Sequence, residues 1–339
     1  MQRFIATAPS TLQKEVLAPP TPQNGEVVVR TEVVGICGSD IHLYRGDHPY
    51  TTYPMVLGHE AAGIVEAVGS GISNLQVGDS VVLEPLIPCG QCYPCSIGRS
   101  NCCSNMKTVG VTTNGALSEF FAVPATCLHK IPSTLPLNIA ALSEPFSIGF
   151  HAAARGVVSA SDQVVIIGAG TIGLTILAAA KQKGARVLIS DILNFRLDIA
   201  NKMGADTIVN SKEADLIQVV LDWTGGRGAS VVIEAVGAPP TIESTIDLVS
   251  DAGRVVIVGV TKQNFCIRGV DVTKKELSII GSRNNLGNFK EAIAFITAHP
   301  DIAENLITDT FSFSETEGAF LHANQHPEIT CKVLITFNG

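Results

Sequence analysis

From about Ser161 the chain alternates short apolar runs with longer amphipathic ones. VVIIG precedes a helical pattern to Gly184, RVLISD precedes one through Met203, and DTIV precedes one to Thr224. The runs SVVIEAVG and RVVIVG continue the alternation. Short, continuously apolar strands that alternate with helices are typical of a parallel sheet covered on both faces. The pattern therefore predicts a doubly wound α/β domain over residues 151–289.

The first strand of this domain runs directly into GAGTIG, a G-x-G-x-x-G pattern formed by Gly168, Gly170 and Gly173. Between a strand and a helix, such glycines permit a tight turn, a close backbone approach to a pyrophosphate and helix–strand packing. Asp191 ends the next strand, eighteen residues beyond Gly173. A carboxylate there can bind the adenosine ribose and would repel a 2′-phosphate. We therefore predict an NAD-binding domain, with NAD favoured over NADP.

Other cofactor contacts are expected where later strands of the same sheet end. Arg196 is expected to lie beside the adenine. The alternative is that it is only a solvent-exposed charge on a helix. The predicted cofactor-binding residues are Gly168, Gly170, Thr171, Ile172, Gly173, Asp191, Arg196, Val236, Val258, Gly259, Ser282 and Arg283.

Residues 1–150 have a different rhythm, in which Gly and Pro separate short β-type runs. EVVVRTEVV, GIVEAV, DSVVLE and SEFFAV predict an antiparallel, barrel-like domain. After Arg283 we expect one helix, from about Phe289 to Ala298, before the apolar run KVLITF. Residues 290–339 are expected to complete the first domain.

A compact C-x2-C-x2-C-x7-C cluster lies in the first domain. Its four thiolates could fill a tetrahedral zinc sphere and leave no open position, which predicts a structural zinc. Its stretch has little apolar content beyond Tyr93 and Ile97, so metal binding would supply much of its folding energy. Disulfides fit poorly with an N-terminus that lacks a secretory signal, and iron–sulfur clusters use other spacings. The predicted ligands are Cys89, Cys92, Cys95 and Cys103, with Cys102 as the alternative fourth.

A second, dispersed set of metal-ligand types comprises Cys37 in GICGSDIH, His59 and Glu60 in GHE, and Glu144 in LSEPF. A catalytic zinc takes three protein ligands and keeps one position open. Asp40 could accept the other ring N–H of His59, the usual arrangement behind a ligating histidine. The alternative to metal ligation by Glu144 is a structural role, in which its carboxylate lies at a helix start before Pro145.

GHE followed by Gly63, Gly69 and Ile72 fits the pattern GHE-x2-G-x5-G-x2-I. The chain thereby resembles the zinc-dependent medium-chain alcohol and polyol dehydrogenases, from GEVVVR near its start to CKVLITF at its end. The resemblance is greatest to their sorbitol, threonine and sugar-acid branch. It implies a GroES-like catalytic domain, a Rossmann domain and a homodimer or homotetramer.

The same resemblance implies Cys37, His59 and Glu60 as ligands of a catalytic zinc, which makes two zinc ions per chain. Liver-type members carry a cysteine where this chain has Glu144, so the choice between Glu60 and Glu144 stays open. The predicted catalytic residues are Ser39, His42, Glu60 and Glu144.

The predicted reaction is hydride transfer from an alcohol to NAD, with zinc lowering the pKa of the substrate hydroxyl. Ser39 can hand the proton towards His42, because an imidazole can both accept and release a proton. In the resemblance these two residues match the proton relay of alcohol dehydrogenases. The alternative is that they only cap the turn or helix after Cys37.

The segment LYRGDHPYTTYP is polar and offers groups for hydroxyls or a carboxylate, namely Tyr44, Arg45, His48, Tyr50 and Tyr53. Arg283 could clamp a carboxylate, with an interdomain salt bridge as the alternative. We predict Tyr44, Arg45 and Arg283 as substrate residues. The pattern resembles the sugar-acid members, which oxidise the C5 hydroxyl of hexonates such as L-gulonate, L-idonate or L-galactonate. A polyol or L-threonine dehydrogenase is the alternative.

Composition agrees with an intracellular enzyme. Of the 339 residues, 46% are hydrophobic and 16% charged, which suits a large core and argues against disorder. The net charge of −8 argues against a nucleic-acid partner. Glycines interrupt the longest apolar stretch, 164–180, and MQRFIATAPS lacks an apolar signal region, so we expect a cytoplasmic protein without a membrane partner. A regulatory NAD-binding protein without catalysis is the remote alternative, which the intact ligand set disfavours.

Overall fold

The computed structural model describes residues 1–49 and 52–337. The chain divides into two compact units, which are described separately below. The first unit contains Met1–Glu144 and Phe289–Gly339, and the second contains Pro145–Asn288. The boundaries therefore fall at 144 and 288, against the predicted 150 and 289.

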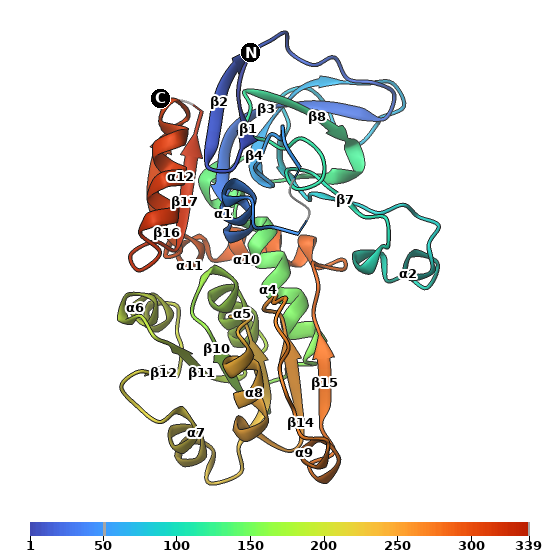
Figure 1. Cartoon of the computed structure of the whole chain (residues 1–339). Coiled ribbons are helices and arrows are strands. Elements are labelled where there is room, and N and C mark those ends of the chain that lie inside the picture. The colour runs from blue at the N-terminus through green and yellow to red at the C-terminus, as the bar shows by residue number, and fades with distance from the viewer. Residues whose placement is uncertain (50–51, 338–339) are drawn as a thin grey trace. The chain divides into compact units, whose positions relative to one another are not determined.

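The first unit is built on a seven-stranded sheet of order β16-β17-β3-β4-β5-β9, with β8 also paired to β3 (Figure 1). All pairs are antiparallel except β16–β17, which is parallel. The Val-rich run that forms β3 is long enough to pair with three strands, and most of its residues are buried. The strands are β3 (Glu26–Ile36), β4 (Glu60–Val68), β5 (Ser80–Leu83), β8 (Phe120–Pro124), β9 (Leu128–Lys130), β16 (Ile307–Ser312) and β17 (Lys332–Thr336).

Shorter elements surround this sheet. A hairpin and a two-stranded ribbon flank it, and the teal segment that carries α2 extends away from it (Figure 1). These elements are β1 (Gln2–Ala8), β2 (Thr11–Val16), α1 (Gly38–Arg45), β6 (Leu86–Ile87), α2 (Tyr93–Ser96), η1 (Ser100–Cys102), β7 (Lys107–Thr108), η2 (Ala125–Cys127) and α3 (Leu137–Ala140).

The expectation of a single helix after Arg283 is wrong. Besides α10 (Phe289–Ala298), the structure contains α11 (Pro300–Glu304), η3 (Phe313–Glu315) and α12 (Thr316–Gln325). Gly318 lies inside α12 and lowers its intrinsic helix propensity. Tertiary packing stabilises α12 instead, since Phe320 is buried with its ring centroid 5.5 Å from that of Tyr44 on α1.

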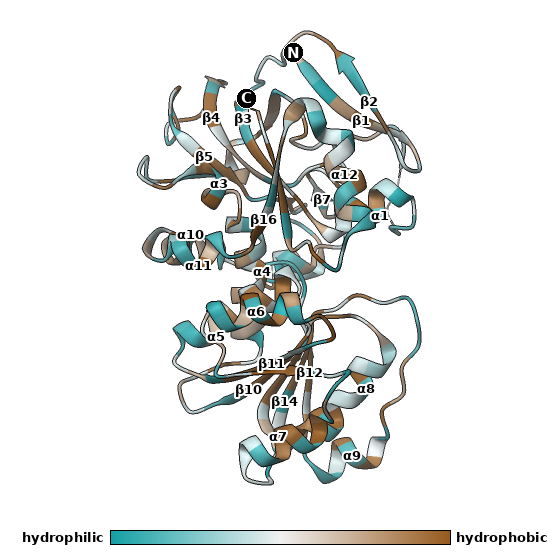
Figure 2. Ribbon diagram, turned by 90° about the vertical axis from the view of Figure 1, so that its left-hand side faces the viewer, coloured by the Kyte–Doolittle hydropathy of each residue, from teal (hydrophilic) through white to brown (hydrophobic). Residues whose placement is uncertain are grey.

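The second unit is a doubly wound parallel sheet, as predicted. Its strand order is β12-β11-β10-β13-β14-β15, so the order reverses between β10 and β13. Figure 2 shows the apolar strands between α5 and α6 on one side and α7 and α8 on the other. The strands are β10 (Gln163–Ile167), β11 (Arg186–Asp191), β12 (Thr207–Asn210), β13 (Ala229–Glu234), β14 (Val249–Ile257) and β15 (Ser278–Gly281). The helices are α4 (Ser143–Arg155), which starts in the first unit, α5 (Thr171–Gln182), α6 (Asn194–Lys202), α7 (Leu216–Thr224), α8 (Pro239–Leu248) and α9 (Gly269–Lys274).

Each unit has its own apolar core, with β3, β4 and β5 contributing to the first and β10, β11, β13 and β14 to the second. A helix long and apolar enough to cross a membrane does not occur among the described residues.

Candidate metal centres and cofactor site

The cysteine cluster gathers in a short lobe of the first unit. The sulfur atoms of Cys89, Cys92, Cys95 and Cys103 all lie within 4.8 Å of one another. The Cys92 sulfur is 3.5 Å from that of Cys95 and 3.7 Å from that of Cys103. Cys102 is absent from this group, so the geometry favours Cys103 as the fourth donor.

The chemistry of the lobe suits a divalent metal. All four cysteines are free thiols, and four sulfur donors at these separations fit a closed tetrahedral zinc site. Backbone N–H groups of Cys95 and Ser104 lower the pKa of Cys92 to about 6, which favours the thiolate that binds metal. No residue of α2 is buried and Tyr93 is 75% exposed, so the lobe lacks an apolar core.

A second donor group lies deep in the same unit. Ligand atoms of Cys37, His59 and Glu60 lie within 4.8 Å of one another. Cys37 joins the end of β3 to the start of α1, and His59 and Glu60 stand at the start of β4. Because β3 and β4 pair antiparallel, the strand ends bring these separate segments together. One thiolate, one imidazole and one carboxylate are donors that a catalytic zinc accepts.

Asp40 organises this donor group. It is fully buried, and its Oδ2 accepts the Cys37 N–H at 2.9 Å while its Oδ1 accepts the Gly58 N–H at 3.3 Å. The same Oδ1 lies 3.3 Å from Nδ1 of His59. Asp40 therefore lies behind His59 as expected, but Nδ1 of His59 makes no hydrogen bond to any described residue, so the predicted hydrogen bond is not formed in this geometry.

The charges around His59 act in a consistent direction. Burial opposes protonation, but the negative charges of Asp40 and then Cys37 raise the pKa of His59 well above its usual value. For Asp40, burial opposes ionisation, yet His59 and two backbone N–H groups lower its pKa overall. A metal ion bound at His59 would replace the proton that this negative environment favours.

Lys332 is a member of the site that sequence reasoning missed. Its Nζ donates to both carboxylate oxygens of Glu60, at 2.6 and 2.7 Å, and to the Ile36 carbonyl at 3.2 Å. Burial alone would lower its pKa, but the charge of Glu60 raises it. No sequence signal identified Lys332, because it lies 272 positions from Glu60 in the chain.

Glu144 starts α4 together with Ser143, as the helix-start alternative proposed. Burial, and then the negative charge of Glu60, raise its pKa to about 7, although His59 acts in the opposite direction. Among the described residues, the grouped donor atoms include Glu60 and not Glu144. The geometry therefore favours Glu60 as the third donor and places Glu144 in the electrostatic surroundings.

Ser39 and His42 both lie on α1, three positions apart. Oγ of Ser39 is 3.4 Å from Nε2 of His59, at the donor group. The His42 side chain is 56% exposed, and its Nδ1 is 2.8 Å from Asp47. Ser39 thus lies beside the donor group and His42, one turn further along the same short helix, is exposed, which suits the predicted proton relay.

The structure gives two of the predicted substrate residues other partners. Tyr44 is buried in the core against Phe320, and Nε of Arg45 donates to Oδ1 of Asn324 on α12 at 2.5 Å. The hydroxyl of Tyr53 donates to the Leu43 carbonyl. Tyr50 lies outside the described residues. These contacts argue against both Tyr44 and Arg45 as substrate residues, because Tyr44 is buried against Phe320 and Arg45 is hydrogen-bonded to α12.

The GAGTIG segment in the second unit forms a cradle that only glycine permits. Gly168 has φ +98°, and a Cβ on Gly173 would lie 1.8 Å from the Gly168 carbonyl oxygen. Gly170 caps α5 without a side-chain hydrogen bond, so the first N–H groups of that helix are left for an anion. This backbone geometry fits a dinucleotide pyrophosphate.

Asp191 ends β11 beside the cradle. Its Oδ2 accepts the Ala169 N–H at 2.7 Å, and its Oδ1 accepts the N–H groups of Ile192 and Leu193. Arg196 lies on α6 with its guanidinium 4.0 Å from Asp191. The carboxylate is therefore fixed against the glycine-rich turn, where a ribose would lie.

The other predicted cofactor residues follow later strands. Val236 is half exposed after β13, and Val258 and Gly259 follow β14, with the Gly259 N–H donating to the Glu234 carbonyl at 3.1 Å. Ser282 follows β15, and its buried Oγ has no hydrogen-bond partner among the described residues. All lie at the carboxyl edge of a parallel sheet whose order reverses at β10 and β13, where such folds bind their ligands.

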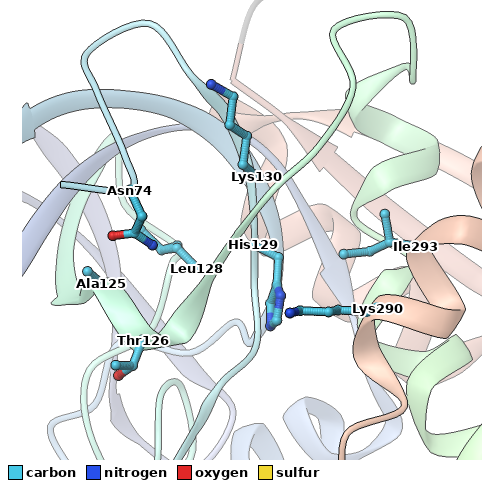
Figure 3. A pocket seen from close by; sticks show the side chains of 8 residues that line it. All are labelled: Asn74, Ala125, Thr126, Leu128, His129, Lys130, Lys290 and Ile293. Atoms are coloured by element: carbon cyan, nitrogen blue, oxygen red, sulfur yellow. The ribbon is translucent and has the colours of Figure 1, made fainter. Parts of the chain in front are cut away.

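A surface hollow of about 480 Å³ lies elsewhere in the first unit (Figure 3). Two of its basic groups already face carboxylates, His129 at 2.6 Å from Glu84 and Lys130 at 2.5 Å from Asp79. None of the predicted site residues lines it, so it is separate from the donor groups. Its lining residues are Asn74, Ala125, Thr126, Leu128, His129, Lys130, Lys290 and Ile293.

Comparison with known proteins identifies the family. The profile described as alcohol dehydrogenase GroES-like domain matches residues 23–133, and the one described as zinc-binding dehydrogenase matches residues 171–298. An uncharacterised zinc-type alcohol dehydrogenase-like protein of Haemophilus influenzae is 41% identical over 96% of this chain and 95% of its own. The chain belongs to the zinc-dependent medium-chain dehydrogenase family.

Two further relatives illustrate the range of this family. L-Galactonate-5-dehydrogenase of Escherichia coli is 34% identical over 93% of this chain and 92% of its own. The crystal structure of the Escherichia coli alcohol dehydrogenase RspB, complexed with NADH, has a TM-score of 0.93 and is 35% identical, covering 99% of each chain. The family assignment confirms the predicted GroES-like and Rossmann architecture, and with it a zinc- and NAD-dependent dehydrogenase.

Proposed function

We propose that this dehydrogenase oxidises a secondary hydroxyl of a sugar acid, at C5 of a hexonate such as L-gulonate, L-idonate or L-galactonate. The main support for an alcohol dehydrogenase is the buried donor group of Cys37, His59 and Glu60. The GAGTIG cradle of the same chain supports NAD as the hydride acceptor. The substrate class rests on relatives and on one arginine, Arg283.

The side chains at and around the donor group have separate proposed roles. When bound, zinc would polarise the substrate hydroxyl and NAD would accept the hydride. Cys37, His59 and Glu60 hold the metal, and Asp40 orients His59. The Ser39 hydroxyl takes the proton of the substrate, and His42 passes it to solvent, since its side chain is largely exposed. The four sulfurs of the cysteine lobe hold a second zinc, which has a structural role.

For the cofactor, we propose NAD rather than NADP. Asp191 is held by three backbone N–H groups at the edge of the glycine-rich turn, so its negative charge is fixed near the adenosine ribose. That charge would repel a 2′-phosphate. The Arg196 guanidinium lies 4.0 Å from Asp191 and 3.9 Å from where a Cβ on Gly170 would stand, so it offsets part of this negative charge.

Two curated relatives support a sugar acid as substrate. L-Galactonate-5-dehydrogenase of Escherichia coli and 2-dehydro-3-deoxy-L-galactonate 5-dehydrogenase of Pseudoalteromonas atlantica are 34% and 35% identical to this chain. Both names describe oxidation at carbon 5 of a sugar acid. Arg283, after β15, is the cation that we propose for the carboxylate, since a guanidinium can bind it through two hydrogen bonds.

A neutral polyol is the second candidate. Sorbitol dehydrogenase of Bacillus subtilis is 34% identical over 95% of this chain, so a relative of similar distance is named for a neutral polyol. The loss of Tyr44 and Arg45 as substrate residues also removes part of the argument for an anionic substrate.

The test is NADH formation, followed by absorbance, with purified zinc-loaded protein and a panel of substrates. The panel contains L-gulonate, L-idonate, L-galactonate, sorbitol, xylitol and L-threonine. We expect a preference for one hexonate, and Arg283→Ala should then raise KM for it. Preference for sorbitol or xylitol would replace the sugar-acid proposal, whereas silence across the panel would contradict both candidates.

We also propose a homo-oligomer. Strand β15 ends the parallel sheet of the second unit, and Ile279 on it is 39% exposed. An apolar strand at a sheet edge invites pairing, and a second copy could supply the same edge by two-fold symmetry. Light scattering after size exclusion tests this. Ile279→Lys should shift the protein towards the monomer, and a wild-type monomer would contradict the proposal.

A further inference from the structure

A lysine is among the most deeply buried side chains of the first unit. Lys332 is 1% exposed, although lysine is almost never fully buried unless it is paired. Its Nζ makes three hydrogen bonds, two to the carboxylate of Glu60 and one to the Ile36 carbonyl. An ammonium has three N–H donors, so all of them are used. The burial of Lys332 is therefore compensated almost entirely through one metal-ligand candidate.

Three neighbouring strands produce this contact. In the antiparallel ladders, Val333 of β17 faces Ile36 of β3, and Gly35 of β3 faces Glu60 of β4. Lys332 starts β17, so its long side chain passes the end of β3 to reach β4. A Cβ on Gly35 would lie 2.4 Å from Oε2 of Glu60. The missing side chain of Gly35 thus makes the space in which the carboxylate meets the lysine.

The pair also changes the charge balance of the donor group. The Cys37 thiolate and the Glu60 carboxylate together carry two negative charges, which a divalent ion would cancel. The ammonium of Lys332 adds one positive charge directly behind Glu60. Asp40 adds a further negative charge behind His59, so the ammonium of Lys332 offsets part of the negative charge around the donor group.

We propose that Lys332 is a positioning residue, which holds the Glu60 carboxylate as the third protein ligand of the catalytic metal. This inference rests on the proposed function of the donor group. Lys332 contacts neither substrate nor cofactor in this role. It fixes the rotamer of Glu60 from behind, as carboxylates and carbonyls do for ligating histidines. A purely structural ion pair is the competing explanation.

The experiment uses Lys332→Met, which keeps the length of the side chain and removes its charge, and Lys332→Arg, which restores the charge. Lys130→Met is the matched control, because Lys130 also pairs with a largely buried carboxylate of this unit, Asp79, away from the donor group. Cobalt replaces zinc, and its visible spectrum reports the ligands directly. Competition with a chelator measures the affinity of each site for zinc.

We expect Lys332→Met to weaken zinc at the Cys37 site by about tenfold to a hundredfold, the range for losing a partner behind a ligand. The cobalt spectrum of that site should change, while the cysteine lobe keeps its metal. Lys332→Arg should recover part of the affinity, and Lys130→Met should change neither readout. A wild-type cobalt spectrum and affinity in Lys332→Met would overturn the proposal.

A second pair of variants keeps the proposal testable if Lys332→Met alone does not fold. Both Glu60→Gln and the double variant Glu60→Gln/Lys332→Met lack the carboxylate that Lys332 contacts. Because Lys332 acts through Glu60, the two should bind cobalt with the same affinity and spectrum. A further loss in the double variant would mean that Lys332 acts independently of Glu60. Wild-type protein with metal only in the cysteine lobe would instead contradict the proposed function itself.

Discussion

The two candidate metal centres lie in one unit but are supported in opposite ways. The cysteine lobe takes all four donors from residues 89–103, and its apolar side chains, such as Tyr93, are largely exposed. The Cys37 site takes its donors from the ends of β3 and β4, and Glu60 and His59 are buried. The lobe therefore depends on its metal for structure, whereas the fold pre-organises the Cys37 site.

This difference separates the consequences of losing each metal. A lobe without a core loses its local order when the ligands no longer share an ion. A buried site held by Asp40 and Lys332 keeps its shape and loses only its chemistry. Single substitutions at the two sites should therefore separate activity from stability.

Cys37→Ser should lower turnover by about 10³-fold or more, because Lewis-acid stabilisation is worth several kcal/mol. Melting temperature and NAD binding should stay near wild type, since the GAGTIG cradle belongs to the other unit. Steady-state NADH formation, thermal unfolding and calorimetric NAD titration measure the three quantities. Wild-type turnover would contradict Cys37 as a metal ligand. Unfolding of the variant would contradict the view that the Cys37 site, unlike the lobe, keeps its structure without metal.

Cys95→Ser should have the reverse profile. We expect the loss of one zinc ion per chain and a fall in melting temperature on the order of several degrees. Cys102→Ser is the matched control, because Cys102 is the neighbouring thiol outside the donor group. Metal analysis and differential scanning calorimetry provide the readouts. If both variants melt alike, the lobe does not depend on its metal.

Asp191→Ala tests the second unit, whose cofactor cradle needs no metal. Removing the fixed carboxylate should reduce the preference for NAD over NADP by roughly tenfold, which corresponds to about 1.4 kcal/mol. Values of kcat/KM for the two cofactors give the ratio. Asp198→Ala on α6 is a control for a general change of surface charge. An unchanged ratio would contradict a contact between Asp191 and the ribose.

The smallest effect concerns acid stability of the second unit. Asp162 accepts hydrogen bonds from Ser230 and Ser159 and pairs with Arg254. Burial opposes ionisation, but the hydroxyls, an N–H group and Arg254 lower the pKa of Asp162 overall. A lowered pKa stabilises the fold above the unfolded-state value of about 3.9, and this contribution disappears as the pH falls through the folded-state pKa.

Asp162→Asn should therefore destabilise the protein by about 1 kcal/mol at neutral pH, as expected for losing a charge-assisted hydrogen bond. The difference from wild type should shrink below about pH 4. Urea unfolding at several pH values measures it. A difference that grows on acidification would have the wrong sign for a carboxylate with a lowered pKa.

Predictions from the sequence agree best with the structure where the signal is local. The glycines of GAGTIG and the spacing of the four cysteines lie within short segments, and the structure brings each set together. The strand and helix alternation after Ser161 likewise matches the doubly wound sheet. Each of these signals depends on backbone geometry or spacing over a few residues, which a sequence displays directly.

Helix α12 shows where local reasoning fails. Its sequence contains an interior glycine and weak helical periodicity, and packing of Phe320 against Tyr44 compensates for that weakness. The same contact removed Tyr44 from the substrate residues. Propensity and polarity alone could identify neither the helix nor its partner, since both depend on segments far apart in the chain.

The strand and helix alternation, the donor types and the glycine-rich turn can thus be identified from short stretches of sequence. The grouping of Glu60 rather than Glu144 with Cys37 and His59, and the position of Lys332 behind Glu60, depend on the assembled sheet. A strand ladder sets neighbours by register between distant segments, and the burial that makes the Lys332–Glu60 pair strong exists only after β17, β3 and β4 have assembled.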